Sequence, residues 1–304
     1  MPAAYTSTYT TRVPYLTVDE YKAAPTGVDV DQLIPGGTTA QNTAALADAI
    51  ARGSSWADQI CHQVLACTAQ TEIKKMSTDR YGSWNITPRM WPVVDLTAAA
   101  WTPVGTNLET SLDPTVAILE EKRITIPGTG LLNTSSLGAI QLGTGGMGQQ
   151  RGWVKFTYLA GWPNTTLTAS VTAGATTITV DSALGIFGTQ PGQQITTGTE
   201  LTIYDGANTE PVTVAAVSGN TLTLTTGLTY AHGTGVSVSA FPPAIKQAVV
   251  SLTSALIKNR GSDAMVMESL TSGPRKVDGL GEPGGLEDVE IAIELLDAFR
   301  SITA

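Results

Sequence analysis

Residues 241–259 read FPPAIKQAVVSLTSALIKN, and this stretch decides how the chain is interpreted. Proline is tolerated in the first turn of a helix, so Pro242 and Pro243 mark a helix start. The apolar side chains that follow recur at the 3.6-residue spacing of one helix face. They are Ile245, Ala248, Val249, Leu252 and Leu256. The stretch therefore predicts a helix through Asn259 that buries one face.

The residues before this helix, 166–240, have a different pattern of apolar and polar residues. Thr alternates with Val, Ile and Leu in short runs, which is the pattern of half-buried strands. The runs are 176–180, 201–204, 211–217, 221–224 and 236–238. Turn signals at 205–206 (DG) and 218–220 (SGN) separate them into hairpins. We expect a small β-barrel or β-sandwich here.

Helical patterns also occur near both ends of the chain. Thr17 and Glu20 have the spacing of a capping box, which predicts a short helix that stops before Pro25. Residues 42–68 predict a long helix, with Gly53 as a tolerated weak point. A last helix is expected after residues 284–285 (GG), and its buried side would hold Val289, Ala292, Ile293, Leu296 and Phe299.

Between residues 72 and 165 the sequence predicts short strands separated by Pro and Gly, at 84–86, 92–96, 116–119, 124–126 and 153–158. Residues 128–152 contain few large apolar side chains and predict an extended arm. The expected fold class is α+β, with a small helical core and short β-hairpins formed by 1–165 and 241–304. An all-β barrel or sandwich-like insert, 166–240, interrupts that core.

The composition favours a protein covered by neighbours over one that binds nucleic acid. Charged residues make up only 14% of the chain, and the net charge is −9. The sequence therefore lacks the basic excess that tight binding to phosphates needs. An acidic wall would instead let a duplex slide past without sticking. The sequence predicts neither a secretory signal nor a membrane-spanning segment, and Cys61 and Cys67 are interpreted as buried thiols.

The motifs that could carry chemistry are weak. Residues 143–148 (GTGGMG) match a dinucleotide fingerprint by letter, but a strand is predicted after them where a helix is required. His62 with Cys61 and Cys67 offers too few ligands for structural zinc. His232 lies in a predicted turn without a nucleophile motif. We therefore expect no catalytic site, no metal and no cofactor.

Partner contacts are predicted from exposed segments instead. Trp91, Trp101 and Trp162 neighbour prolines in loops, where Trp can serve either as core or as interface anchor. The Gly-rich loop 261–285 contains an apolar cluster and a basic pair. The candidate partner-binding residues are Met265, Val266, Met267, Arg275, Lys276, Phe299, Arg300, Trp91, Trp101 and Trp162.

Five segments together resemble the head-to-tail connector (adaptor) proteins of tailed bacteriophages. The segments are 15–21 (YLTVDEY), the helix 42–68, 154–162 (VKFTYLAGW), 241–248 (FPPAIKQA) and 295–300 (LLDAFR). Their order and spacing carry the resemblance, which covers roughly half of the chain. Family members are usually much shorter, and the 166–240 insert is an addition. That insert is similar to small β modules of phage structural proteins at 174–180 (GATTITV) and 231–235 (AHGTG).

The resemblance implies a structural virion protein of the phage neck, made in the host bacterial cytoplasm. It implies a homo-oligomeric ring of twelve subunits that docks under the portal protein and receives a stopper or tail-completion protein. The ring would form part of the channel through which DNA passes without sequence-specific binding. The C-terminal helix and the loop 261–285 are expected to reach the portal. From its length and low apolar content, and not from the resemblance, the arm 128–152 is expected to contact a neighbour or the next ring.

Two alternatives belong to other classes. A capsid or tail decoration protein would use the β insert to bind a host surface, for which Tyr204, Tyr230 and Phe187 are the available aromatic residues. An enzyme such as a cell-wall hydrolase would need a pair of carboxylates or a Cys/His dyad, and the sequence shows neither pattern.

Overall fold

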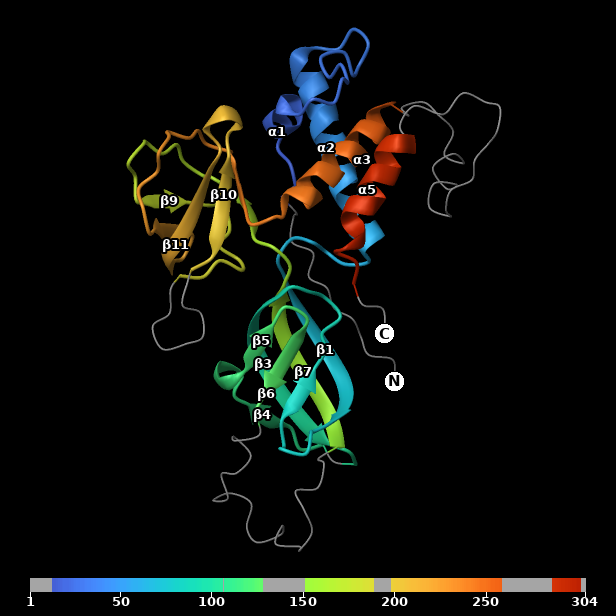
Figure 1. The fold of residues 1–304 in the computed structure, drawn as a ribbon, viewed down its shortest axis with the longest axis vertical. Helices are drawn as coiled ribbons and strands as arrows, with labels where there is room; N and C mark the ends of the chain where they lie inside the picture. The colour runs from blue at the N-terminus through green and yellow to red at the C-terminus, as the bar shows by residue number, and fades with distance from the viewer. Residues whose placement is uncertain (1–12, 106, 128–150, 189–197, 259–285, 302–304) are drawn as a thin grey trace, which may run out of the picture. The chain divides into compact units, whose positions relative to one another are not determined.

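The computed structural model describes residues 13–105, 107–127, 151–188, 198–258 and 286–301. The fold is α+β (Figure 1). The described residues separate into two compact units. One contains residues 66–162 and Ser301, and the other contains residues 13–65 and 163–300. The predicted division into a discontinuous core and a 166–240 insert stays a prediction.

The first unit is built from two antiparallel sheets. The larger has the order β1-β7-β3-β4, with β1 (Thr68–Ser77), β7 (Arg151–Ala160), β3 (Val93–Pro103) and β4 (Thr110–Leu112). The smaller has the order β2-β6-β5, with β2 (Trp84–Ile86), β6 (Arg123–Ile126) and β5 (Ile118–Glu120). A short 3-10 helix, η1 (Pro114–Val116), precedes β5.

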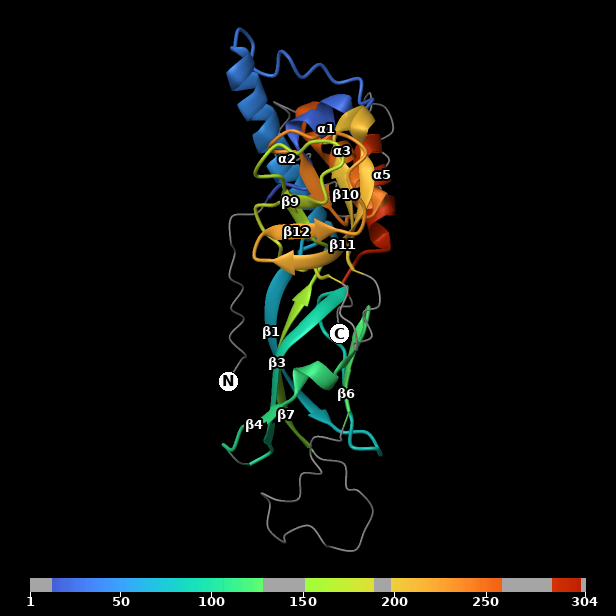
Figure 2. The same cartoon turned by 90° about the vertical axis from the view of Figure 1, so that its left-hand side faces the viewer.

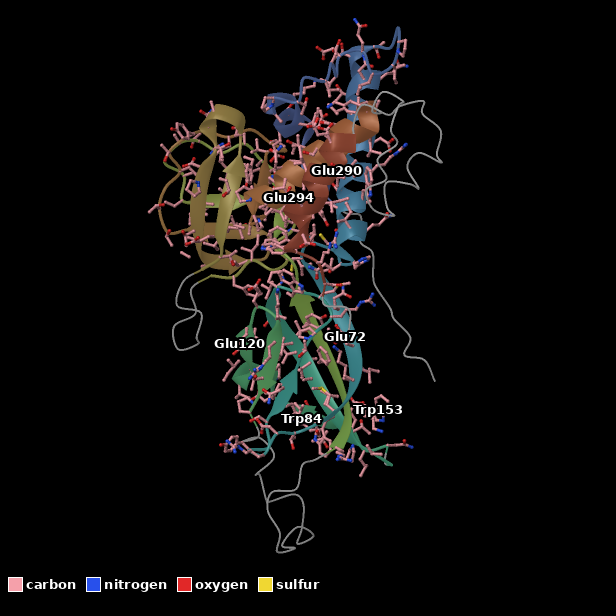
Figure 3. The ribbon with its side chains drawn as sticks, turned by 45° about the vertical axis from the view of Figure 1, so that its right-hand side comes forward. Glu72, Trp84, Glu120, Trp153, Glu290 and Glu294 are labelled. Carbon is pink, nitrogen blue, oxygen red and sulfur yellow. The ribbon has the colours of Figure 1, made fainter. Side chains whose placement is uncertain are left out.

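Alternation along the long strands places one face of the larger sheet in a core. Val154, Phe156 and Tyr158 of β7 point inward and are buried. They pack with Leu96 of β3 and with residues of the smaller sheet and the β2–β3 segment, among them Trp84, Ile86, Met90, Ile124 and Ile126. Trp84 is fully buried, and Figure 3 labels it in this unit. Because the two sheets cover the same apolar side chains, each stabilises the other.

The second unit contains the helices α1 (Val18–Ala23), α2 (Thr39–Cys61), α3 (Pro243–Lys258) and α5 (Leu286–Asp297). The predicted capping box at Thr17 is confirmed, and Thr38 with Gln41 forms a second one at the start of α2. The helices α2, α3 and α5 pack against one another (Figure 1). At the α2–α3 contact the backbones approach closely at Gly53, where an added Cβ would lie 2.5 Å from Thr253 Oγ1.

The second unit also contains a six-stranded antiparallel sheet, called here the β module (residues 164–239). Its order is β8-β13-β10-β11-β12-β9, with β8 (Asn164–Thr166), β13 (Ser237–Ser239), β10 (Glu200–Tyr204), β11 (Glu210–Ser218), β12 (Thr221–Leu224) and β9 (Thr177–Thr179). A bridge between Leu167 and Val180 joins the two edge strands. Two further backbone hydrogen bonds, Thr168 N to Thr179 O and Asp181 N to Thr166 O, close the sheet into a barrel. Figure 2 labels β9, β10, β11 and β12 of this sheet.

Two sequence predictions need correction. The helix predicted for 42–68 ends at Cys61, because His62 adopts a left-handed conformation (φ 53°) and caps the helix. Cys67 therefore lies outside the helix, next to β1. Short strands occur in residues 72–165 as predicted, at β2, β5 and β6, but β1, β3 and β7 are 10, 11 and 10 residues long, so strands dominate where a small helical core with short hairpins was expected.

Candidate interaction surfaces

Half of the predicted partner-binding residues cannot be placed. Met265, Val266, Met267, Arg275 and Lys276 lie outside the described residues, as does most of the predicted arm 128–152. Phe299 and Arg300 follow α5. The Phe299 carbonyl accepts a hydrogen bond of 2.8 Å from Gln63 Nε2, and exposed Arg300 lies 3.3 Å from the Asp297 carboxylate.

The three tryptophans predicted as anchors pack within the first unit. Trp91 is buried and meets Trp162 edge to face, with ring centroids 6.0 Å apart. The ammonium of Lys122 lies 3.8 Å from the Trp91 ring centroid. Trp101 is half-buried beside Trp84 at 5.6 Å. Their role in partner binding stays a prediction.

A different tryptophan is exposed on the outer face of the larger sheet. Trp153 of β7 has 47% of its surface accessible, and Ile73 of β1 has 48%. Figure 3 labels Trp153 on this strand. The inward neighbours of Trp153, Gly152 and Val154, are buried, so the alternation of β7 directs the indole outward. The sequence WVKFTY at 153–158 carries this signal, because every second residue is apolar and buried.

The strand register defines which side chains share the outer face. Across β1, β7 and β3 the outward residues form three rows: Thr71, Thr157 and Ala98; Ile73, Lys155 and Ala100; Lys75, Trp153 and Thr102. Lys75 Nζ lies 6.0 Å from the Trp153 ring centroid. None of these nine residues is acidic. The set is called here the basic sheet face.

A surface of opposite charge lies on α5. Glu287, Glu290, Ile291 and Glu294 are exposed, while Val289, Ala292 and Leu296 are buried on the opposite side of the helix. Figure 3 labels Glu290 and Glu294 on α5. Ile291 has 45% of its surface accessible and lies on the helix surface between Glu287, four residues before it, and Glu294, three residues after it. Glu287, Glu290, Ile291 and Glu294 are called here the acidic stripe.

The sequences of the two units also differ in net charge, and the unit that contains the acidic stripe is the more acidic one. Residues 66–162 contain eight Lys and Arg against seven Asp and Glu, and the remaining residues contain nine against 19. The segment of the first unit is therefore close to neutral, about +1, while the rest carries −10. The chain as a whole is acidic because of the residues outside 66–162.

A buried lysine joins α1, α3 and the β module within the second unit. The ammonium of Lys246 on α3 pairs with Glu20 of α1, donates to Ser237 Oγ at 3.2 Å, and lies 3.6 Å from the ring centroid of Tyr204. Burial lowers the pKa of Lys246, an effect that Glu20 only partly offsets. Glu20 also accepts from the Thr17 amide at 2.6 Å. One carboxylate therefore caps α1 and holds the lysine.

A second polar cluster lies inside the β module. His232 is buried, and its Nδ1 and Nε2 atoms lie 2.9 Å from Asp205 Oδ2 and 2.8 Å from Glu210 Oε1. Each ring nitrogen thus lies within hydrogen-bond distance of a different carboxylate. Burial acts to raise the pKa of Glu210, but hydrogen bonds from the Thr229 amide, His232 and the Tyr230 amide outweigh it, and the pKa is lowered. Both ring nitrogens are thus occupied by structural contacts.

The remaining chemical candidates have structural roles or lie outside the described residues. His62 is exposed at the end of α2, and the glycine motif 143–148 is not described. Cys61 and Cys67 are free and buried, and burial raises the pKa of each thiol to about 12. Among the described residues, no three His, Cys, Asp or Glu side chains are grouped so as to hold a metal ion. No helix in the described ranges is both long and apolar enough to cross a membrane.

No protein-family model matches the sequence, and a search of curated proteins finds no match. Two solved structures align over almost the whole chain. One is a chain of the neck of an empty gene transfer agent particle with C6 symmetry, at 15% identity and a TM-score of 0.37 over 99% of this chain and 97% of that chain. The other is a chain of the native gene transfer agent virion, at 15% identity and a TM-score of 0.35 with the same coverage. Neither fold nor function is inferred from likenesses this distant.

Proposed function

We propose that the chain is a structural protein of the phage neck, an adaptor subunit that links the DNA-filled head to the tail. The observation that carries the proposal is the packing of α1, α2, α3 and α5 in one unit. The sequence segments that resemble the connector family are scattered between residues 15 and 300, yet four of them overlap these helices. A chance similarity in scattered segments would not be expected to collect them in one packed group.

The end of β7 also supports the assignment as an adaptor subunit. The strand ends at Ala160 and is followed by Gly161 and Trp162. Gly161 has φ 103°, a conformation that favours glycine, and its amide donates to the Pro92 carbonyl. The glycine is thus required by the turn that follows β7. The family-like motif at 154–162 therefore has a local structural reason in this chain.

In the proposed role, about twelve copies form a ring below the portal and receive a stopper or tail-completion protein. A ring requires a heterologous contact, in which one surface of a subunit meets a different surface of the next and rotation closes the series. The low content of charged residues suits a subunit whose surface is shared with neighbours. The net charge of −9 suits a channel that DNA traverses without being held.

The proposal assigns no catalytic step to the chain. It agrees with the kinds of particle in which the two distant structural neighbours are found, but it does not rest on them. The β module is an addition to the adaptor helices in this view.

The test starts from the phage that encodes this chain. The gene is deleted, and lysates of the deletion strain are examined by electron microscopy. The adaptor role predicts DNA-filled or leaking heads beside separate, finished tails. Complementation with the intact gene should restore joined particles. Intact tailed particles in the deletion strain would contradict the adaptor role.

A second candidate is a decoration protein that binds a surface through the β module. Tyr230 of this module has 42% of its surface exposed, as does Leu184. Decoration predicts that the deletion strain makes tailed particles that fail to adsorb or lose stability. The same micrographs therefore separate the two functions.

A further inference from the structure

We propose that the basic sheet face of one copy binds the acidic stripe of α5 on another copy. That this contact joins neighbouring subunits of a ring rests on the proposed function. The pairing of the two surfaces itself is argued from the residues of this chain. A heterologous contact of this kind uses two different surfaces of each subunit, so every copy can take two neighbours.

The basic sheet face presents cations without competing carboxylates. Lys75 and Lys155 lie in adjacent rows of β1 and β7, on the diagonal of the antiparallel pair. Lys155 forms no ion pair with any described residue, and Lys75 contacts Trp153. Two cations on one sheet attract an acidic partner. Because the sheet already holds their backbone in place, binding loses mainly side-chain conformational entropy.

The acidic stripe is complementary in charge. Glu287, Glu290 and Glu294 make no ion pair among the described residues, whereas the neighbouring Asp288 pairs with Lys258 at 2.7 Å. Among the described residues, these three carboxylates are thus the exposed acidic groups of α5 without an ion-pair partner.

The spacing of the charges also agrees. Diagonal neighbours in an antiparallel pair are about 7–8 Å apart, which is the separation expected between Lys75 and Lys155 at the sheet surface. Glu290 and Glu294 are four residues apart on a helix, a rise of about 6 Å. Flexible lysine side chains span the difference, so both pairs can form at once.

Apolar side chains accompany the charges on both surfaces. Trp153 and Ile73 are exposed beside the lysines, and Ile291 is exposed between the glutamates. Exposed apolar groups of this size lose water-accessible area on association and stabilise it, while charges around them set the orientation. The basic sheet face therefore fits this helix better than it fits a DNA backbone, which offers charge without an apolar side chain.

The test uses the purified full-length protein as a mixture of ¹⁵N-labelled and unlabelled chains. A carbodiimide joins amines to carboxylates only where they touch. We expect inter-chain cross-links from Lys75 or Lys155 to Glu290 or Glu294, identified by mass spectrometry, and association by sedimentation that weakens as salt is raised. Wild-type chains that stay monomeric and yield no such cross-link at the highest attainable concentration would overturn the proposal.

Charge reversals sharpen the result. Lys155→Glu and Glu294→Lys should each weaken self-association by at least about tenfold, because an attraction becomes a repulsion. The double variant should recover most of the loss. The matched controls are Arg80→Glu, in the loop after β1, and Asp48→Lys, exposed on α2, and they should associate as the wild type does. Single variants equal to the controls, or no recovery in the double variant, would overturn the pairing.

These outcomes are separate from those of the gene deletion. Intact tailed particles in the deletion strain would remove the adaptor role and leave a cross-linked pair of surfaces standing. Heads and tails that fail to join, together with unaltered association of the single variants, would support the adaptor role and refute this contact.

Discussion

Replacing Lys246 by methionine tests the junction of α1, α3 and the β module. Methionine keeps the length and the apolar stem but removes the ammonium, so Glu20 is left in a site where its side chain is 10% exposed. Removing one partner of a buried ion pair costs about 3–5 kcal/mol, since the other charge stays unpaired. We expect about 3 kcal/mol here, because Glu20 retains the Thr17 amide as a donor.

Hydrogen exchange followed by mass spectrometry measures this effect locally. A loss of 3 kcal/mol raises the exchange rates of amides in α3 and β13 on the order of 100-fold, if they exchange through the opening of the second unit. Amides of β1 and β7, in the first unit, serve as the internal reference and should change far less.

A matched control lies on the same helix. Lys258 pairs with Asp288 at the surface, with side chains 36% and 23% exposed, so Lys258→Met should cost less than about 1 kcal/mol. The double variant Lys246→Met, Glu20→Gln removes both charges of the buried pair and should recover to within about 1 kcal/mol of the wild type. A Lys246→Met protein that exchanges like Lys258→Met would refute the assignment of Lys246 as the junction.

Three further predictions concern the second unit. Gly53→Ala should lower the free energy of unfolding by about 1–3 kcal/mol despite the better helix propensity of Ala, because the new Cβ meets Thr253, and Thr253→Ala should restore part of the loss in urea titrations. His232→Ala should destabilise the β module by about 1–3 kcal/mol, since the carboxylates of Asp205 and Glu210 lose a hydrogen-bond partner; unchanged amide protection in β10 and β11 would contradict this. Because the pKa of Glu210 is lowered in the fold, its stabilisation is complete above the ordinary value of 4.5 and is lost as the pH falls through the lowered pKa. Acid unfolding monitored by the same amides should show this slope in the wild type and a reduced one in Glu210→Gln.

Elements with strong local signals were predictable from the sequence. The helix after Pro242 begins at Pro243 as expected, since the apolar spacing and the proline agree. The strands of the β module lie where Thr alternates with Val, Ile and Leu. The closure of that sheet through Leu167 and Val180 could not be predicted, because alternation alone could suggest either a barrel or a sandwich.

β1 shows why the rest could not be predicted. Its sequence, TAQTEIKKMS, contains few apolar residues, and only Gln70 is buried on the strand. The strand forms because its whole length pairs with β7, from Thr68 opposite Ala160 to Ser77 opposite Arg151. Such long-range pairing leaves no periodic trace in the strand itself. The same pairing brings Lys75 beside Trp153, so the basic sheet face was missed for the same reason.

A neighbouring proline did not decide whether a tryptophan is buried or exposed. Trp91 is followed by Pro92, yet the indole is buried against Trp162. Trp153 has no proline neighbour and is exposed because of its parity on β7. For Trp153, position within the strand therefore decides the exposure.

The first and last strands of the β module are neighbours, and this bears on how such a chain can change over evolution. Asn164 pairs with Ser239, and the Ala240 amide donates to the Pro163 carbonyl at 2.9 Å. The two points where the chain passes into and out of the module are thus one hydrogen bond apart. A sequence could gain or lose the whole barrel there while the flanking backbone keeps its course, since the gap left behind is bridged by a short turn. Genes for particle proteins can in this way exchange an entire module by recombination without redesign of the helices, and a foreign domain with adjacent ends could be grafted at the same position.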